Sequence, residues 1–319
     1  MNISKFIRGQ VSRREFLIRM GRAALIAGML PISTDNASAE AKGKKSSGIG
    51  LALGSGGASG LAHIVVVEAL EELGLQPERI SGSSIGALIG GLVAAGYDSK
   101  KLKDLVAEMV PEGLGNWLGA VFETDRVNVL DLFELDIEAG GLADSETFRK
   151  FLEETLGKDR FEELYIPLSV TATDFWEREM VVFDSGSLIP PIMASAALPG
   201  VFPPIEYQGR LLVDGGMVNP VPYDLIMDKV DITIAVDVTG TRKRPQDGKP
   251  GYLDLVFNTF DIMQANVIRQ MRNKQEPDIF LQPPVKDIRV LDFHKAEEIY
   301  KQAAPVKEEL KRKIEQIYG

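Results

Sequence analysis

The sequence predicts an α/β fold in three layers, in which a central, mostly parallel sheet is flanked by helices. Short apolar runs typical of buried strands alternate along the chain with longer runs of helical periodicity. Glycine-rich turns stand at points where a strand-like run passes into a helix-like one. No internal repeat, low-complexity tract or Pro/Gly/Ser linker divides residues 45–319, so we expect one domain there.

The first elements have clear boundaries in the sequence. Residues 49–54 predict a buried strand, and after a glycine-rich turn residues 61–74 predict a helix. A second short strand closes at residues 82–84, and the helix that follows covers residues 85–95. This strand, helix, strand, helix order is typical of a parallel sheet whose strands are covered on both faces.

The remainder of the chain continues the same alternation. Strands are expected at 166–175, 180–183, 210–216, 231–240 and 279–284, and helices near 99–109, 144–156, 252–273 and 294–317. All of these runs fit one covered sheet rather than two separate domains.

The first 39 residues predict an export signal rather than part of the fold. Paired arginines in 12-SRREFLI-18 precede the apolar run 23–32, and the small residues 37-ASA-39 follow it. That is the order of n-region, h-region and cleavage site, and the arginine pair resembles a twin-arginine signal, whose route carries folded proteins. We expect a periplasmic or otherwise extracytoplasmic protein, membrane-associated if the signal is retained. The expected division is a signal at 1–39, a linker at 40–47 and one domain at 48–319.

Composition narrows the classes of partner and chemistry. The chain has 46 Asp and Glu against 36 Lys and Arg, a formal net charge of −10. This charge argues against a nucleic-acid partner and provides no general attraction to anionic membranes. The absence of cysteine excludes disulfides, thiolate metal sites and a lipoprotein anchor. We expect no metal and no other cofactor.

The segment Gly82-Ser83-Ser84-Ile85-Gly86 matches the pattern G-x-S-x-G. In this pattern a serine sits on a tight turn from a strand to a helix, and the glycines avoid Cβ clashes while the hydroxyl projects from the sheet. The match falls where the apolar period changes from strand to helix, and the helix would place its positive N-terminal end at Ser84. Ser84 is therefore a candidate nucleophile; the alternative is a capping or turn serine.

A serine nucleophile needs a base, and Asp214 is the better candidate. It ends the apolar run 211-LLVD-214 and is followed by two glycines, so it lies where α/β sheets place their chemistry. The alternative is an Asp-Gly turn in a hairpin.

The two histidines are weaker candidates for the base. His294 follows Ser84, Asp214 and Asp237 in the Ser, Asp, His order of α/β-hydrolases, but it heads a charged amphipathic helix. His63 lies inside the helix after the glycine-rich turn, where a packing role is the default. Both histidines remain alternatives to Asp214 at this point.

The glycine-rich segment 53-LGSGGASG-60 supplies donors for an oxyanion. Glycines between a strand and a helix let successive backbone N–H groups converge near a helix N-terminus. A nucleotide-phosphate loop is the competing interpretation, but no lysine follows as in a P-loop. The acidic residues about 20 positions later, Glu71 and Glu72, lie within a predicted helix rather than after a second strand.

Together, four motifs resemble the patatin-like phospholipase family across nearly all of residues 48–240. They are Gly56-Gly57-Ala58-Ser59-Gly60, Gly82-Ser83-Ser84-Ile85-Gly86, 194-ASAALPGVFPPIE-206 and Asp214-Gly215-Gly216, in this order. The resemblance implies a patatin-like fold and a Ser84/Asp214 dyad without a catalytic histidine. It also implies an oxyanion hole from the backbone of Gly56, Gly57, Ala58 and Ser59, structural roles for Gly60, Gly82, Gly86, Gly215 and Gly216, and hydrolysis of phospholipid or other acyl esters.

Two positions depart from the family pattern. Ser59 stands where the family usually has Arg or Lys, and Ser83 stands where it often has Thr. If a basic side chain at position 59 supports the loop or offsets the oxyanion charge, activity is lower here. This leaves a carboxylesterase or transacylase with the same dyad, or a weakly active lipid-binding protein, as alternatives.

Two further segments are candidates for transient membrane contact, each beside a simpler interpretation. Residues 114–122 place apolar side chains near one helical face, as core packing or as an acyl-binding rim or lid. The locally basic loop 241–251 is either solvated or in contact with lipid headgroups.

Overall fold

A computed structural model describes residues 48–112, 145–241 and 252–318. The predicted export signal, the linker, segment 114–122 and nearly all of the basic loop lie outside the described residues, so they stay predictions. Residues 44–313 form one compact unit by their contacts, and the sheet and the site lie within it.

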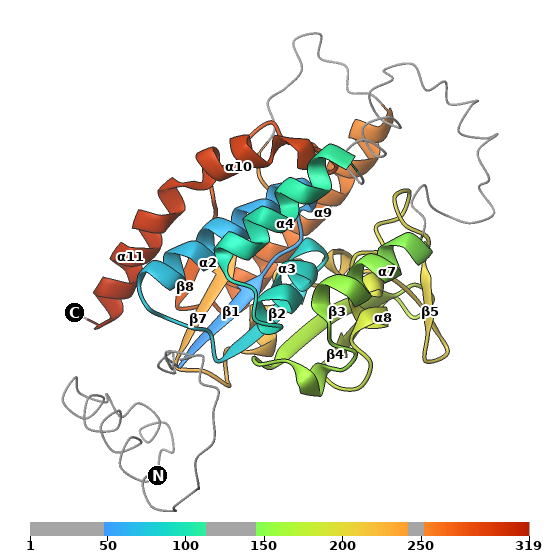
Figure 1. The fold of residues 1–319 in the computed structure, drawn as a ribbon, viewed down its shortest axis with the longest axis horizontal. Coiled ribbons are helices and arrows are strands. Elements are labelled where there is room, and N and C mark those ends of the chain that lie inside the picture. The colour runs from blue at the N-terminus through green and yellow to red at the C-terminus, as the bar shows by residue number, and fades with distance from the viewer. Residues whose placement is uncertain (1–47, 113–144, 242–251, 319) are drawn as a thin grey trace, which may run out of the picture. The chain divides into compact units, whose positions relative to one another are not determined.

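The sheet has eight strands among the described residues, in the order β5-β6-β3-β2-β1-β7-β8, with β4 paired to β3 (Figure 1). The strands are β1 (Ile49–Leu53), β2 (Arg79–Ser83), β3 (Leu168–Asp174), β4 (Met180–Phe183), β5 (Ile205–Tyr207), β6 (Arg210–Asp214), β7 (Ile232–Val236) and β8 (Ile279–Leu281). Every residue of β1, β3 and β7 is buried, which is typical of strands covered on both faces.

The helices fill the segments between the strands. They are α2 (Ala62–Glu72), α3 (Ile85–Ala94), α4 (Ser99–Glu112), α7 (Ser145–Leu156), α8 (Ile189–Ser195), α9 (Tyr252–Lys274), α10 (Ala296–Ala303) and α11 (Pro305–Tyr318). Short 3-10 turns are η1 (Gly57–Leu61), η3 (Phe161–Glu163), η4 (Gly215–Met217), η5 (Tyr223–Leu225) and η6 (Phe293–Lys295).

Alternate residues of the strands face different helices. Gly90 of α3 lies over one face, since an added Cβ there would stand 3.0 Å from Ile80 Cγ2 and 3.6 Å from Leu53 Cδ1. On the other face, Ala52 and its neighbours pack in a buried cluster with Ile268 of α9. The predicted three-layer α/β architecture is therefore confirmed.

The sheet is mixed, with a larger antiparallel part than the sequence predicted. Pairs β1·β2, β1·β7, β2·β3 and β7·β8 are parallel, and pairs β3·β4, β3·β6 and β5·β6 are antiparallel. The β5·β6 hairpin turns on Gln208 and Gly209, both at positive φ, as tight hairpins require. Strand β5 was not predicted from the sequence, because it has only three residues.

Two other differences have causes in proline. The predicted helix 294–317 is broken into η6, α10 and α11, and α11 begins at Pro305, whose ring cannot continue a preceding helix but fits a first turn. Helix α8 was not predicted; Pro190 and Pro191 lie in its first turn. In both places proline marks a helix start.

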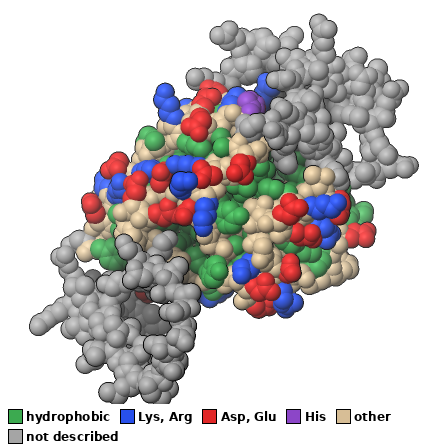
Figure 2. All heavy atoms as spheres, viewed as in Figure 1, with side chains coloured by type: hydrophobic (Ala, Val, Ile, Leu, Met, Phe, Trp, Pro, Cys, Tyr) green, Lys and Arg blue, Asp and Glu red, His purple; other side chains and the backbone are tan. Residues whose placement is uncertain are grey.

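Salt bridges join the helices on the face seen in Figure 2, where acidic and basic side chains are interspersed. Lys307 lies 2.6 Å from Glu68 and 2.9 Å from Glu72, and Lys103 also contacts Glu68 at 2.9 Å. These contacts connect α2 with α4 and α11. Because each group is partly exposed, we assign them at most about 1 kcal/mol each.

The register of β3 explains how the sheet places its site. Strand β4 pairs with residues 170–173 of β3, and both β2 and β6 overlap that range. A residue in a ladder has one partner on each side, so β2 and β6 must share the other edge of β3. Ser83 of β2 pairs with Thr171, and Asp214 of β6 pairs with Ala172. The two strands therefore meet end to end, with their carboxyl ends facing each other.

Candidate active site

Ser84 occupies the turn between β2 and α3 with φ 55° and ψ −125°. A residue other than glycine is uncommon at positive φ, and such strain gathers at functional sites. Close packing holds the turn in place: a Cβ at Gly86 would collide with the carbonyl oxygen of Leu53 at the end of β1. The structure thus has the strand-to-helix turn that G-x-S-x-G predicted.

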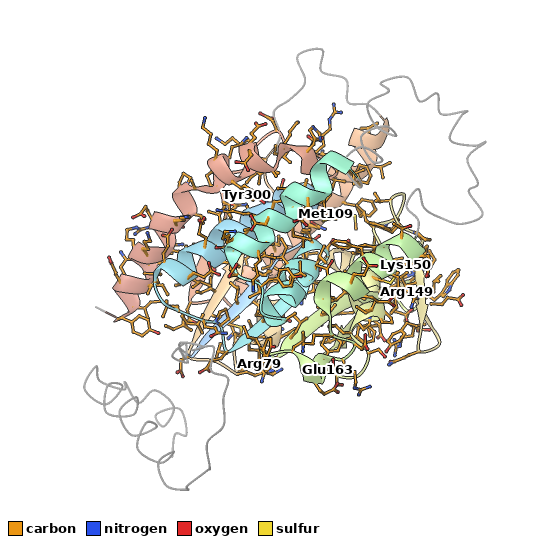
Figure 3. The ribbon with its side chains drawn as sticks, viewed as in Figure 1. Arg79, Met109, Arg149, Lys150, Glu163 and Tyr300 are labelled. Atoms are coloured by element: carbon orange, nitrogen blue, oxygen red, sulfur yellow. The ribbon has the colours of Figure 1, made fainter. Side chains whose placement is uncertain are left out.

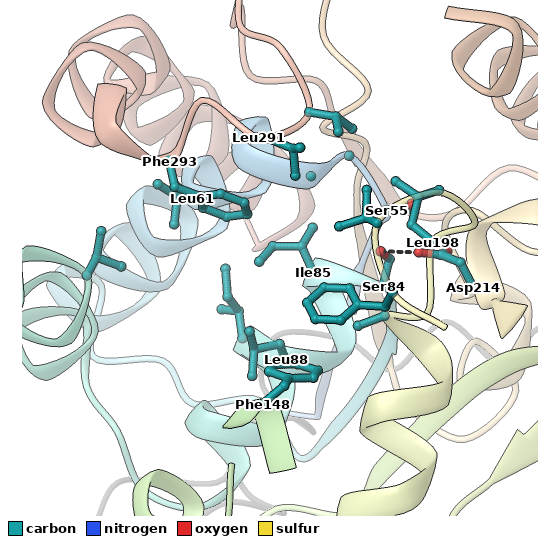
Figure 4. A pocket seen from close by; sticks show the side chains of 18 of the residues that line it. Ser55, Leu61, Ser84, Ile85, Leu88, Phe148, Leu198, Asp214, Leu291 and Phe293 are labelled. Carbon is teal, nitrogen blue, oxygen red and sulfur yellow. Dashed lines mark hydrogen bonds between the residues drawn. The ribbon is translucent and has the colours of Figure 1, made fainter. Parts of the chain in front are cut away.

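The side chains of Ser84 and Asp214 meet where β2 and β6 meet. The Ser84 hydroxyl donates to Asp214 Oδ2 at 2.6 Å (Figure 4). The other carboxylate oxygen, Oδ1, accepts the backbone N–H of Gly216 at 2.7 Å. Both side chains are buried, with Asp214 only 2% exposed. The structure therefore brings together the two residues that the sequence selected as nucleophile and base.

Burial changes the acidity of Asp214. It raises the pKa of this carboxyl from 3.8 to about 6, while the hydrogen bonds from Ser84 and Gly216 act in the opposite direction. The higher pKa makes Asp214 a stronger base than an exposed carboxylate, and the group is still mostly ionised at pH 7.

One short segment at the end of α8, residues 195–197, holds the backbone of both Ser84 and Asp214. The Ser195 hydroxyl accepts the N–H of Ser84 at 2.9 Å, and the carbonyl of Ala197 accepts the N–H of Asp214 at 3.0 Å. Ser195 is fully buried. Residues 195–197 therefore bridge the junction between β2 and β6.

Some backbone amides of the glycine loop donate to carbonyls elsewhere in the fold, and others do not. Those of Gly54, Ser55 and Ala58 donate to the carbonyls of Val236, Pro220 and Val290 at 3.0, 2.8 and 2.8 Å. Within the described part of the chain, no such acceptor is found for the amides of Gly56 and Gly57. Both glycines line the same cavity as Ser84 and Asp214.

The loop needs glycine at its turning point. Gly57 has φ 56°, and an added Cβ would stand 2.5 Å from the carbonyl oxygen of Val290. At each of the other motif glycines an added Cβ would also come within 3 Å of another atom: Gly60, Gly82, Gly215 and Gly216.

The expected oxyanion set is thus narrower than the sequence indicated. Ala58 is a correction, because its amide already donates to Val290. Ser59 is buried in η1 and does not line the cavity. Its hydroxyl lies near Gly240 instead, since a Cβ added to Gly240 would stand 3.5 Å from it. The sequence of the loop does not reveal which backbone amides are already hydrogen-bonded. It therefore predicted four oxyanion donors, of which the structure leaves two, Gly56 and Gly57.

Neither histidine is placed to act on Ser84. His63 is fully buried, and its Nε2–H donates to the carbonyl of Gly54 at 2.8 Å. Burial lowers the pKa of His63 to about 4, so the ring is neutral at pH 7. His294 is exposed in η6 and does not line the cavity. The histidine-based alternative is therefore not supported by the geometry, and the packing role expected for His63 fits its position.

An apolar cavity of about 150 Å³ extends from the Ser84 hydroxyl. Figure 4 shows Ser84 and Asp214 beside Leu198, with Leu88 and Phe148 further along the wall. Helix α7 contributes Phe148 and Phe151 to the lining, while Arg149 and Lys150 on its other face are exposed (Figure 3). Phe148 also stacks on Phe202, with ring centroids 4.9 Å apart.

The sequence analysis missed one polar pair at the site. Gln264 of α9 donates to the Ser55 hydroxyl at 3.1 Å, and both line the cavity although they are nearly buried. A Cβ at Gly216 would stand 2.5 Å from each of their polar atoms. The two residues are 209 positions apart, and no local pattern in the sequence connects them.

The described residues contain no group of three or more His, Cys, Asp or Glu side chains placed to hold a metal ion. None of the described helices combines the length and the apolar character needed to cross a bilayer.

Comparison with known families decides the assignment. The family model described as "Patatin-like phospholipase" matches residues 51–227, more than half of the chain. The chain belongs to the patatin-like phospholipase family. The match confirms the resemblance seen in the motifs and the patatin-like fold with its mixed sheet flanked by helices.

Two relatives differ in their sequence identity to this chain and in how much of their length it covers. An uncharacterized NTE family protein of Mycobacterium tuberculosis is 38% identical over 211 residues, 66% of this chain and 54% of that protein. Lysophospholipase NTE1 of Saccharomyces cerevisiae is 28% identical over 277 residues, 79% of this chain and 16% of that protein. This patatin-like chain thus spans about half of the first relative and a small part of the second.

Among solved structures, VipD from Legionella pneumophila is similar with a TM-score of 0.41 at 14% identity, over 91% of this chain and 73% of VipD. ExoU of Pseudomonas aeruginosa, solved with SpcU, has a TM-score of 0.42 at 14% identity, over 84% of this chain and 52% of ExoU. The family assignment rests on the family model and not on these distant likenesses.

We predict that Ser195→Ala lowers kcat for a short-chain p-nitrophenyl ester by roughly tenfold, about 1.4 kcal/mol in the barrier, with KM unchanged. The variant removes the acceptor of the Ser84 N–H and so loosens Ser84 relative to Asp214, whereas it leaves the cavity lining intact. Steady-state kinetics separate the two constants.

The matched control is Ser81→Ala. Ser81 is also a fully buried serine of this patatin-like chain, and its hydroxyl donates to the carbonyl of Pro222 at 2.8 Å. Each variant leaves one buried group unpaired, which costs about 1–3 kcal/mol of stability. An equal loss of kcat in both variants would show that Ser195 has no specific positioning role.

Proposed function

We propose that this protein is a lipid acyl hydrolase of the phospholipase A or esterase type, with Ser84 as nucleophile and Asp214 as its base. The observation that carries the proposal is the 2.6 Å hydrogen bond from the Ser84 hydroxyl to Asp214 at one end of an apolar cavity. Membership of the patatin-like phospholipase family and the printed name of its yeast relative, a lysophospholipase, support the same class.

Acylation follows from the positions of these groups. Ser84 Oγ attacks the ester carbonyl carbon while its proton passes to Asp214, and the carbonyl oxygen becomes an oxyanion. The free amides of Gly56 and Gly57 are the proposed donors to that oxygen, and one such donor is worth about 2.7–4 kcal/mol in the barrier. When the tetrahedral intermediate collapses, the ester C–O bond breaks and the leaving alcohol takes the proton from Asp214.

Deacylation reverses the roles. Water attacks the acyl-enzyme carbonyl and gives a proton to Asp214, and the fatty acid leaves as the proton returns to Ser84. Asp214 must be ionised to accept a proton in either half-reaction. The strong burial that raises its pKa to about 6 therefore helps it as a base while leaving it ionised near neutral pH.

The cavity lining supports an acyl chain as the group that binds. Helix α3 lines it with Ile85, Leu88, Ile89 and Leu92, which share one helical face. At 1.5 Å of rise per residue this stripe is roughly 10 Å long. Burying a methylene there is worth about 0.8 kcal/mol, which favours lipid esters over the small esters of a general carboxylesterase. A transacylase would use the same dyad and differ only in the acceptor of the acyl group.

We predict that Ser84→Ala and Asp214→Asn each lower turnover of a p-nitrophenyl ester and of a phospholipid by at least a thousandfold. The variants should keep their folded circular dichroism spectra. For the unmodified protein, kcat/KM should fall as the pH drops below about 6, because protonated Asp214 accepts no proton from Ser84.

Neighbouring residues provide matched controls. Ser83 is fully buried, and its hydroxyl has no hydrogen-bond partner among the described residues, so Ser83→Ala should retain activity. Asp237 is a second buried aspartate, which is hydrogen-bonded to Thr239 and Gln282 instead of a serine nucleophile. Asp237→Asn is therefore the matched control for Asp214→Asn. Substantial turnover by Ser84→Ala or Asp214→Asn would refute the dyad, and loss of activity only in His294→Ala would favour a histidine-based triad.

We also infer export, on the basis of the N-terminal sequence pattern alone. The paired arginines, the apolar run and the 37-ASA-39 site support transport of the folded protein to the periplasm. The expected mature chain begins near Glu40, and N-terminal sequencing of protein recovered from the periplasmic fraction tests this. An intact Met1 on protein retained in the cytoplasm would contradict it.

A further inference from the structure

The turn between β3 and β4 exposes two aromatic side chains. Phe175 is 47% exposed and Trp176 is 71% exposed, and their rings meet edge to face with centroids 4.9 Å apart. On the outer face of β4, Met180 and Val182 are also exposed. We call these four residues the hairpin patch.

The turn that carries the aromatic pair is firmly held. Asp174 Oδ1 accepts the N–H groups of Trp176 and Glu177, each at 3.0 Å, and Oδ2 lies 3.1 Å from Arg210. The N–H of Phe175 donates to the carbonyl of Leu211 at 2.8 Å. These contacts hold the backbone of the turn against β6, which reduces the entropy that the turn loses on contact with a partner.

The hairpin patch lies at the same end of the sheet as Ser84. Ser83 pairs with Thr171, and Asp214 pairs with Ala172. Strand β3 then continues through Asp174 into the turn, so Phe175 stands roughly 10 Å beyond the level of Asp214 at about 3.3 Å per residue. The exposed aromatic pair thus projects past the catalytic end of the sheet.

The charges around the turn nearly cancel, with three carboxylates (Asp174, Glu177 and Glu179) against two guanidinium groups (Arg178 and Arg210). Arg210 contacts both Asp174 and Glu179, at 3.1 and 3.3 Å, while Glu177 and Arg178 carry opposite charges on adjacent residues. The hairpin patch therefore has no surplus of positive charge to attract anionic lipid. A nearly neutral rim around exposed aromatic rings suits zwitterionic headgroups, and tryptophan is enriched at the level of lipid headgroups.

We propose that the hairpin patch is a docking surface for a zwitterionic lipid layer, into whose headgroup region Phe175 and Trp176 insert. The proposal rests on the proposed lipid acyl hydrolase function. Docking at this end of the sheet brings Ser84 and its apolar cavity near the lipid layer, so that an ester has a short path to the nucleophile.

Tryptophan fluorescence tests the proposal directly. The chain contains two tryptophans, Trp117 and Trp176, so Trp117→Phe leaves Trp176 as the sole reporter. In a Ser84→Ala background, which prevents turnover of the lipid, phosphatidylcholine vesicles should shift the Trp176 emission to shorter wavelength. Vesicles that contain brominated phosphatidylcholine should quench it. An emission that neither shifts nor is quenched would overturn the proposal.

Substitutions test whether the position of the patch matters. Phe175→Ser with Trp176→Ser should weaken vesicle binding in a flotation assay at least fivefold and slow hydrolysis of vesicle phospholipid, with turnover of a soluble p-nitrophenyl ester unchanged. The matched control is Tyr165→Ser. Tyr165 is 72% exposed and precedes β3, at the opposite end of the same strand, so its loss should leave vesicle binding intact.

Each other outcome has a defined meaning. Equal loss of vesicle binding in the Tyr165→Ser variant would overturn the proposal. So would a protein that does not bind vesicles but forms dimers that Trp176→Ser abolishes, since the hairpin patch would then contact a second copy. A shift of Trp176 emission in the Ser84→Ala protein, together with no ester hydrolysis by the protein that keeps Ser84, would support docking while refuting the proposed function, so the two failures are distinguishable.

Discussion

The site depends on one constraint, the end-to-end meeting of β2 and β6 along a single edge of β3. Parallel strands bring their carboxyl ends to one side of a sheet, but β6 is antiparallel to β3 and would by itself end on the opposite side. It reaches the site because it pairs only with the last residues of β3, beyond the point where β2 stops. Ser84 and Asp214 thereby come from two directions to one place, and residues 195–197 hydrogen-bond to the backbone of both.

This arrangement has an energetic cost that the rest of the fold offsets. Burial raises the pKa of Asp214 from 3.8 to about 6, so ionising the carboxyl is less favourable in the folded chain than in water by about 3 kcal/mol. Because the folded state binds the Asp214 proton more tightly than the unfolded state, the contribution of Asp214 to the free energy of unfolding falls as the pH rises from about 4 to about 6. The positive φ of Ser84 adds strain of order 1–3 kcal/mol. Both costs lie on groups with proposed chemical roles, where stability and activity commonly conflict.

Much of the architecture could be predicted from local sequence. Short runs rich in apolar and β-branched residues predicted β1, β3 and β7, and glycines around Ser84 and after Asp214 predicted two tight turns that the structure contains. These signals are local, because steric conflict at a turn involves residues close in sequence. The antiparallel β5·β6 hairpin and α8 were missed, since three and seven residues are too few for an apolar pattern to repeat clearly.

Contacts between distant residues could not be predicted in the same way. Ser195 is 111 residues from Ser84, and Gln264 is 209 residues from Ser55; both depend on strand order. Likewise, no side-chain pattern reveals that Val290 accepts the amide of Ala58, whereas the amides of Gly56 and Gly57 have no backbone acceptor among the described residues. Asp214 was predicted as the base because it would end a strand of a parallel sheet. In the structure it ends the antiparallel strand β6, so it meets Ser84 for a different geometric reason.

The most direct test of the Ser84/Asp214 dyad is mass spectrometry of the protein after reaction with a fluorophosphonate. A single covalent adduct on Ser84, absent from Ser84→Ala and formed much more slowly in Asp214→Asn, is the predicted result. An unmodified Ser84, or an adduct on another serine, would contradict the account.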